Sequence, residues 1–163
     1  MATAYLGIGS NQDPERHIVL AIGWLQNTFI DAAFSPFYRS RSVGFRGADF
    51  INLVARIETH APLLDLKELL NAFEDSHGRR RDVPKFSDRT LDIDILLYDE
   101  IQLESPDLTL PRPETFRFAH VLKPLADLAP EIEIPGADKT AGELWDAFPA
   151  PDDTLVRVNL ADW

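Results

Sequence analysis

Cysteine is absent from the 163-residue sequence. This absence excludes disulfide bonds, thiolate nucleophiles and cysteine-ligated zinc, and it suits the reducing cytoplasm, where we expect the protein to work. No stretch approaches the ~20 consecutive apolar residues of a membrane-spanning helix, so we expect no membrane association. The first ten residues, MATAYLGIGS, have no basic segment of the kind that opens a signal peptide, and they are typical of a strand.

Basic residues are scarce as well: 16 Lys and Arg stand against 27 Asp and Glu, a net charge of −11, which argues against binding to nucleic acid. Residues 79–91 reverse this balance, because five cations there face only Asp82 and Asp88, a local charge of +3 (5 − 2). A compact basic segment in an acidic chain favours a small polyanionic ligand. A solvated loop with scattered charges is the alternative.

Hydrophobic periodicity predicts strands over 2–8, 30–40, 50–59 and 91–98, and helices that begin after Asp13 and Asp65 and over 115–128, the last interrupted by Pro124. Asp65 and Glu68 have the spacing of a capping box. The order βαββαβ predicts an α+β fold, a ferredoxin-like sandwich with additional C-terminal helix and strand elements. Without a linker or a repeat, residues 1–163 are expected to form one domain.

Two aspartates stand out in the segment Leu91-Asp92-Ile93-Asp94-Ile95. Side chains alternate between the faces of a strand, so Asp92 and Asp94 share one face. Neighbouring carboxylates repel unless a cation lies between them, and aspartate has poor strand propensity, so the pair suits a hard dication with oxygen ligands. An exposed edge strand with acidic side chains in water is the alternative.

The surroundings of this pair favour phosphoryl transfer from a nucleotide. The strand follows the basic segment directly, and Glu74 lies just upstream on the preceding helix. Carboxylates that bind magnesium, with arginines that bind phosphate oxygens, are the groups that this chemistry requires. No Walker A loop, kinase catalytic loop, zinc-protease motif or serine elbow is present. Gly7 and Gly9 lack the third glycine of a dinucleotide fingerprint, and we interpret Gly9-Ser10-Asn11 as a turn that ends the first strand.

The segments Glu74–Arg81 and Arg89–Tyr98 resemble the signature of the 6-hydroxymethyl-7,8-dihydropterin pyrophosphokinase family of folate biosynthesis. The similarity continues through Gly9-Ser10-Asn11, Asp49-Phe50-Ile51-Asn52 and Leu108-Thr109-Leu110-Pro111, and it covers nearly the whole chain. It implies a ferredoxin-like fold and magnesium-dependent transfer of pyrophosphate from ATP to the pterin hydroxymethyl group, with release of AMP. It also implies small-molecule partners, and we expect a monomer.

The resemblance assigns roles by position. It implies that Asp92 and Asp94 hold two magnesium ions that bridge the triphosphate, and that Arg81, Lys85 and Arg89 contact phosphates as catalytic residues. The positions expected near the nucleotide also include Asn71, Glu74, Ile95, Leu108, Thr109 and Arg112. The positions expected near the pterin are Ser40, Val43, Phe50, Asn52, Phe86, Asp92 and His120. Strand alternation independently puts Phe50 and Asn52 on one face, a ring for stacking beside an amide for hydrogen bonding.

Several positions depart from the family pattern. Lys85-Phe86-Ser87-Asp88 replaces an arginine-tryptophan pair followed by glycine and proline, so a bidentate fork and an indole N–H are lost. Arg112 replaces a histidine, while Phe118 and His120 replace an arginine and a phenylalanine. These departures motivate two alternatives to the folate enzyme: a paralogue that acts on another pterin or alcohol, and a module that binds nucleotide or pterin without turnover. A structural α+β domain with incidental acidic strand residues is a further alternative.

Overall fold

The computed structural model describes residues 1–78, 90–149 and 155–159. Within these residues the elements are, in chain order, β1 (Ala2–Ser10), α1 (Pro14–Thr28), β2 (Asp31–Phe34), β3 (Phe37–Ser40), β4 (Phe50–Thr59), α2 (Leu63–Ser76), β5 (Asp92–Tyr98), β6 (Leu103–Glu104), β7 (Thr109–Leu110), α3 (Glu114–Arg117), α4 (Ala119–Leu128), β8 (Glu133–Ile134), β9 (Lys139–Thr140), α5 (Ala141–Asp146) and β10 (Val156–Val158). No helix in this described part of the chain is long and apolar enough to cross a membrane.

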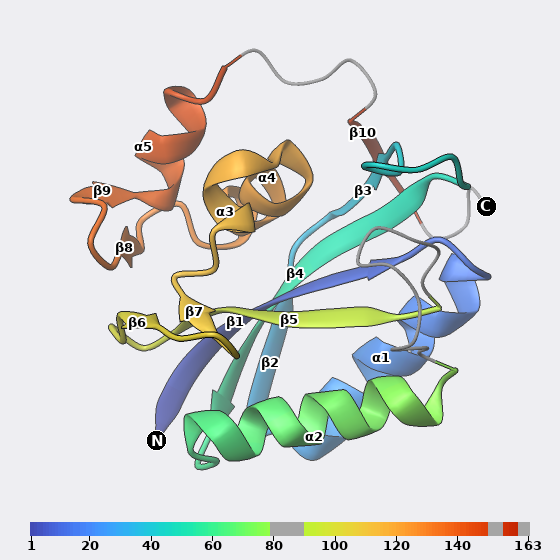
Figure 1. Ribbon diagram of the computed structural model, residues 1–163, viewed down its shortest axis with the longest axis horizontal. Coiled ribbons are helices and arrows are strands. Elements are labelled where there is room, and N and C mark those ends of the chain that lie inside the picture. Colours follow the sequence, from blue (N-terminus) through green and yellow to red (C-terminus); the bar gives the residue numbers. More distant parts are fainter. Residues whose placement is uncertain (79–89, 150–154, 160–163) are drawn as a thin grey trace.

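The main sheet has the strand order β10-β3-β4-β1-β5, with β2 also paired to β4, and every neighbouring pair is antiparallel. Helices α1 and α2 lie on one side of the sheet, and α3, α4 and α5 lie on the other side (Figure 1). If β2 and β3 are counted as one interrupted strand, β1 to β5 follow the order βαββαβ. The predicted α+β fold is therefore confirmed.

The two faces of the sheet contribute to two separate cores. On β4, Ile51, Leu53, Ala55 and Ile57 point into the core under α1 and α2, whereas Val54 points into the core under α4 and α5. This is the alternation that the sequence predicts for β4. On the first side, Trp24 of α1 stacks on Phe73 of α2 with ring centroids 4.1 Å apart, which joins the two helices.

The single strand predicted over 30–40 is divided into β2 and β3 at Ser35-Pro36. The pairing with β4 shifts by one residue there, from Phe34 opposite Ala55 to Tyr38 opposite Asn52. Proline has no N–H for the ladder, and the Ser35 hydroxyl oxygen accepts the Val54 N–H at 2.8 Å. The interruption is therefore a bulge that keeps the backbone groups of β4 satisfied.

Two predictions about helix boundaries are wrong. The C-terminal helix is interrupted at Phe118, which has extended backbone angles between α3 and α4, and Pro124 lies inside α4. The capping box expected at Asp65 is absent from α2, because this helix already begins at Leu63. A capping box does occur in α5, where Thr140 and Glu143 exchange side-chain to backbone hydrogen bonds of 3.1 Å.

Candidate active site

Two glycines of β1 lie beside the two aspartates on the face of the sheet away from α1 and α2. Gly9 pairs with Asp92 of β5 on one side and with Asn52 of β4 on the other, and Gly7 pairs with Asp94. A Cβ atom on Gly9 would lie 3.3 Å from the Asn52 Oδ1. The turn predicted at Gly9 is therefore wrong: this residue lies inside β1, and its missing side chain leaves bare backbone between two polar groups.

Asp92 and Asp94 share this face and are both partly exposed, and the Asp94 side chain is 33% accessible. Ile93 and Ile95 point the opposite way into the first core, as strand alternation predicts. The alternation ends at Leu96. Leu6 of β1 pairs with Ile95 and the adjacent Tyr5 pairs with Leu97, so Leu96 is an extra residue without a partner on β1. The bulge allows the same strand to present carboxylates at one end and apolar side chains to the second core at the other.

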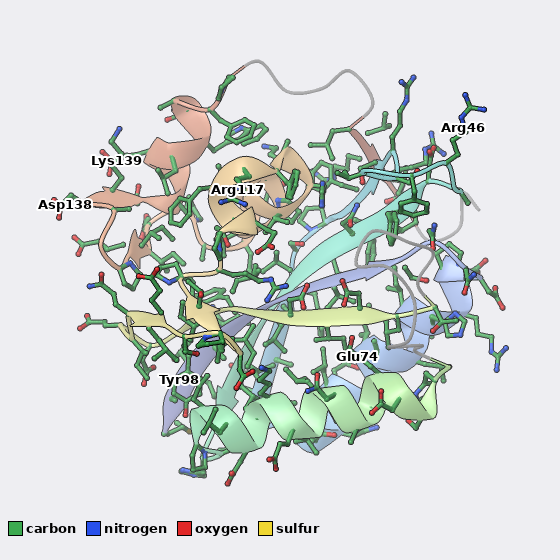
Figure 2. The ribbon with its side chains drawn as sticks, viewed as in Figure 1. Arg46, Glu74, Tyr98, Arg117, Asp138 and Lys139 are labelled. Carbon is green, nitrogen blue, oxygen red and sulfur yellow. The ribbon has the colours of Figure 1, made fainter. Side chains whose placement is uncertain are left out.

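Glu74 fixes the strand of aspartates to α2. Its side chain is only 2% exposed, and its carboxylate accepts the backbone N–H of Ile93, between the two aspartates, at 3.3 Å. Figure 2 shows Glu74 pointing from α2 toward β5. Because β5 is an edge strand of the sheet, this N–H faces away from the ladder and needs such a partner. The observed contact is a positioning contact, whereas a contact of Glu74 with nucleotide stays a prediction.

Arg112 reaches Asp94 from the segment between β7 and α3. Its backbone N–H donates to the carbonyl oxygen of Leu96 at 2.9 Å, which places it alongside β5. Its guanidinium Nη2 lies 3.5 Å from Asp94 Oδ1, and its Nε lies 3.2 Å from Glu114 Oε2. The sequence suggested a cation here, but its two acidic neighbours were not predicted.

Asn52, Ser40 and Phe50 lie together on the other flank of Gly9. The Asn52 amide donates to the Ser40 hydroxyl at 2.8 Å and to the Tyr38 carbonyl oxygen at 3.3 Å, and all three partners are at most 7% exposed. These bonds direct the amide nitrogen toward β3 and leave Oδ1 beside Gly9. The ring of Phe50 is partly exposed and meets Phe45 edge to face, with ring centroids 6.4 Å apart.

Ser10 and Asn11 are positioning residues that the sequence did not reveal. The Ser10 hydroxyl donates to the Thr90 carbonyl oxygen at 2.6 Å, just before β5, and the Asn11 amide donates to the Ala48 carbonyl oxygen at 3.1 Å, just before β4. Ser10 is fully buried and Asn11 is 5% exposed. Two consecutive polar residues at the end of an apolar strand were the available signal, but their partners are distant in sequence.

The remaining candidate residues differ in how far they are exposed. Ile95 and Leu108 are 3% and 6% exposed within the first core, so a ligand at these positions would meet main chain rather than side chain. Val43 lies on the surface at 36% exposure. Asn71 and Thr109 are partly exposed. The four predicted residues of the basic segment lie outside the described residues, namely Arg81, Lys85, Phe86 and Arg89.

His120 stacks on Phe118 at the beginning of α4, with ring centroids 5.2 Å apart and an interplanar angle of 19°. Burial lowers the pKa of His120 to about 4, so the imidazole is neutral at pH 7. A neutral, partly buried ring can offer a flat surface and one N–H donor to a heterocycle. Its contact with a pterin stays a prediction.

The donor set of this site fits magnesium. Magnesium is bound by one or two carboxylates together with waters and substrate phosphates. Asp92 and Asp94 supply two carboxylates beside glycine backbone, and the described residues contain no group of three His, Asp or Glu side chains that would enclose a metal. The side chains present therefore suit a metal that arrives with a phosphate ligand rather than a closed protein cage.

Solved structures identify the fold class. Two crystal structures of wild-type Plasmodium falciparum HPPK-DHPS match 96% of this chain with TM-scores of 0.69 and 0.67, at 14% and 13% sequence identity. The chain spans about half the length of those structures (47% and 46%). At this identity the likeness concerns the fold alone, and it supports the α+β class.

The sequence family is more specific. Residues 5–130 match the 7,8-dihydro-6-hydroxymethylpterin-pyrophosphokinase family, and the chain belongs to it. The 2-amino-4-hydroxy-6-hydroxymethyldihydropteridine pyrophosphokinase of Haemophilus influenzae is 35% identical over 98% of this chain and 99% of that protein. The enzyme of the same name from Pseudomonas aeruginosa is 41% identical over 80% of this chain and 83% of its own length. The resemblance predicted from the motifs is confirmed.

Proposed function

We propose that the protein transfers the pyrophosphoryl group of ATP to the hydroxymethyl oxygen of 6-hydroxymethyl-7,8-dihydropterin, giving the diphosphate ester and AMP in folate biosynthesis. The main observation in support of this proposal is that Asp92 of β5 and Asn52 of β4 lie on either side of Gly9 of β1. It puts a carboxylate suited to metal and phosphate, and an amide suited to a heterocycle, on either side of bare backbone. Family membership supports the same reaction.

Asp92 and Asp94 are the proposed ligands of two magnesium ions. When bound, magnesium neutralises triphosphate charge and makes the β-phosphorus more electrophilic. The pterin hydroxyl oxygen attacks that phosphorus and gives up its proton to water, the bond between the β-phosphorus and the oxygen that it shares with the α-phosphorus breaks, and AMP leaves with that oxygen. Glu74 holds the backbone between the two aspartates in place, so the carboxylates remain on one face during the reaction.

Asn52 and Phe50 are the proposed pterin contacts. The Asn52 amide nitrogen is already bonded to Ser40, which fixes Oδ1 as an acceptor beside Gly9. Phe50 supplies a ring on the same face, and His120 a second flat group. Arg81, Lys85, Arg89 and Arg112 are proposed to contact phosphates, and Phe86 the pterin. We further propose one domain over residues 1–163 that acts as a cytoplasmic monomer.

The test is AMP formation from ATP and Mg²⁺ with and without the pterin. We expect AMP that depends on the pterin, and a loss of turnover of at least ~1000-fold in Asp92→Asn, because a metal ligand supplies several kcal/mol to the transition state. Asp107→Asn, at an exposed aspartate between β6 and β7, is the matched control and should keep wild-type turnover. Absence of pterin-dependent AMP from the folded protein rejects the proposal, and AMP formation with another alcohol alone favours a paralogue.

A further inference from the structure

Arg112 occupies an unusual position for a phosphate-binding residue, because its guanidinium already lies against a proposed metal ligand. Its Nη2 is 3.5 Å from Asp94 Oδ1. The guanidinium carries a positive charge and presents its N–H donors in a rigid planar fork. A dication that approaches Asp94 therefore meets a fixed positive charge, and the two cations compete for one carboxylate.

The position of Arg112 is defined from two directions. Its backbone N–H is bonded to Leu96 O, two residues beyond Asp94 on β5, and its Nε lies 3.2 Å from Glu114 Oε2. The three side chains are 26%, 33% and 22% exposed for Arg112, Asp94 and Glu114. Solvent and salt screen such partly buried charges less than surface charges. The guanidinium thus lies between an acidic residue of the metal site and an acidic residue outside it.

We propose that Arg112 is a resident counter-cation of Asp94 and makes metal binding depend on nucleotide binding. This inference rests on the proposed function. A triphosphate gives the guanidinium a second anionic partner, so that Arg112 exchanges Asp94 for phosphate oxygens as the metal binds. Glu114 stays against Nε and keeps the side chain beside the site during the exchange. Arg112 is a positioning residue for the metal in the free protein and a phosphate ligand in the complex.

The test measures the affinity of the full chain for Mn²⁺ alone, without nucleotide or pterin, by calorimetry or by the electron paramagnetic resonance of free Mn²⁺. We expect Arg112→Gln to bind Mn²⁺ about 5-fold more tightly than the wild type, because a cation next to the ligand is removed. Glu114→Gln should bind it about 2-fold more weakly, because the guanidinium loses its second anion. Arg117→Gln, at an exposed arginine of α3, is the control and should not change the affinity.

The opposite signs distinguish charge competition from damage to the site, since damage weakens Mn²⁺ binding in both variants. Addition of a non-hydrolysable ATP analogue should reduce the difference between Arg112→Gln and wild type, because the guanidinium then has phosphate to bind. The inference is overturned if folded Arg112→Gln binds Mn²⁺ as weakly as the wild type or more weakly. If Arg112→Gln does not fold, Glu114→Gln decides: Mn²⁺ binding as tight as in the wild type, or tighter, overturns the inference. If the wild-type protein forms AMP and one of these two contradicting results is found, only this inference is refuted. If the wild-type protein forms no AMP, the proposed function is refuted.

Discussion

Asp92 and Asn52 lie opposite the same residue, Gly9, from the two strands that flank β1, although 40 positions separate them in the sequence (92 − 52). Antiparallel strands hold residues directly opposite one another about 5 Å apart, so a glycine between two such residues opens a short gap with a polar group on each side. The proposed reaction needs one substrate on each flank of this gap, with the reacting atoms between them.

Gly9→Ala tests whether the gap must remain open. The new Cβ would lie 3.3 Å from Asn52 Oδ1 and 3.7 Å from a carbon of the Phe50 ring, so the amide has to shift by a few tenths of an ångström. We expect a folded protein whose KM for the pterin rises about 10-fold, since an amide misplaced by that amount loses a hydrogen bond worth ~1 kcal/mol or more.

Gly7→Ala is the matched control, because its Cβ would meet a flexible methyl group of Leu96 at 3.2 Å rather than a polar group. We expect the KM for the pterin in this variant to stay within about 2-fold of the wild type. Equal increases of KM in both variants would contradict a specific role for the Asn52 flank.

Glu74→Ala tests the attachment of β5 to α2. The Glu74 side chain is only 2% exposed, and its removal leaves the buried Ile93 N–H without its acceptor. This loss should lower the free energy of unfolding by ~2 kcal/mol. Glu74→Gln keeps an acceptor oxygen and should cost less than half as much. Urea denaturation measures both, and Glu68→Ala, on the exposed side of the same helix, serves as the reference. A Glu74→Ala variant as stable as Glu68→Ala would remove the positioning role.

His120 predicts a pH dependence of stability. Its folded-state pKa of about 4 lies below the ordinary value of 6.5, so the unfolded chain binds a proton that the folded chain does not between these two values. Stability therefore falls as pH decreases through this window and is not affected by this group above it. Compared with His120→Asn, the wild type should lose ~3 kcal/mol of additional stability between pH 7 and pH 4. Parallel stability curves for the two proteins would refute the buried, neutral state of this ring.

Tyr38 and Asp127 connect β3 to α4. The Tyr38 hydroxyl donates to the Asp127 carboxylate, whose other oxygen lies 2.9 Å from Lys123 Nζ. Burial and this carboxylate raise the pKa of Tyr38. We expect Tyr38→Phe and Asp127→Asn each to destabilise the protein by ~1–2 kcal/mol, with a coupling energy of at least ~0.5 kcal/mol in the double-mutant cycle. Strictly additive effects would show that the hydrogen bond contributes nothing to stability.

The sequence predicted the parts of this structure that depend on local periodicity. Alternation along single strands placed Asp92 with Asp94 and Phe50 with Asn52, because side chains in a strand change face at every residue whatever lies beside it. The βαββαβ order followed from the same periodicity, and the family motifs followed from short contiguous segments.

The parts that depend on pairing between distant segments were not predicted. From its local sequence alone, Gly9 is predicted to be a turn residue. Only its pairing with Asp92 and Asn52 shows why a side chain is excluded there. Arg112 lies beside Asp94 because its backbone N–H bonds to the Leu96 carbonyl oxygen, at a one-residue bulge of β5 that leaves no clear periodic signal. The interruption at Phe118 was assigned to Pro124, because proline is the stronger helix breaker by propensity.

The most direct test of the central claim is a crystal structure of the protein with Mg²⁺, a non-hydrolysable ATP analogue and 6-hydroxymethyl-7,8-dihydropterin. The account predicts that carboxylate oxygens of Asp92 and Asp94 lie about 2.1 Å from magnesium, that the polyphosphate lies on the same face, and that Asn52 Oδ1 hydrogen-bonds the pterin ring. Magnesium and polyphosphate bound elsewhere, with Asp92 and Asp94 free of metal, would contradict it.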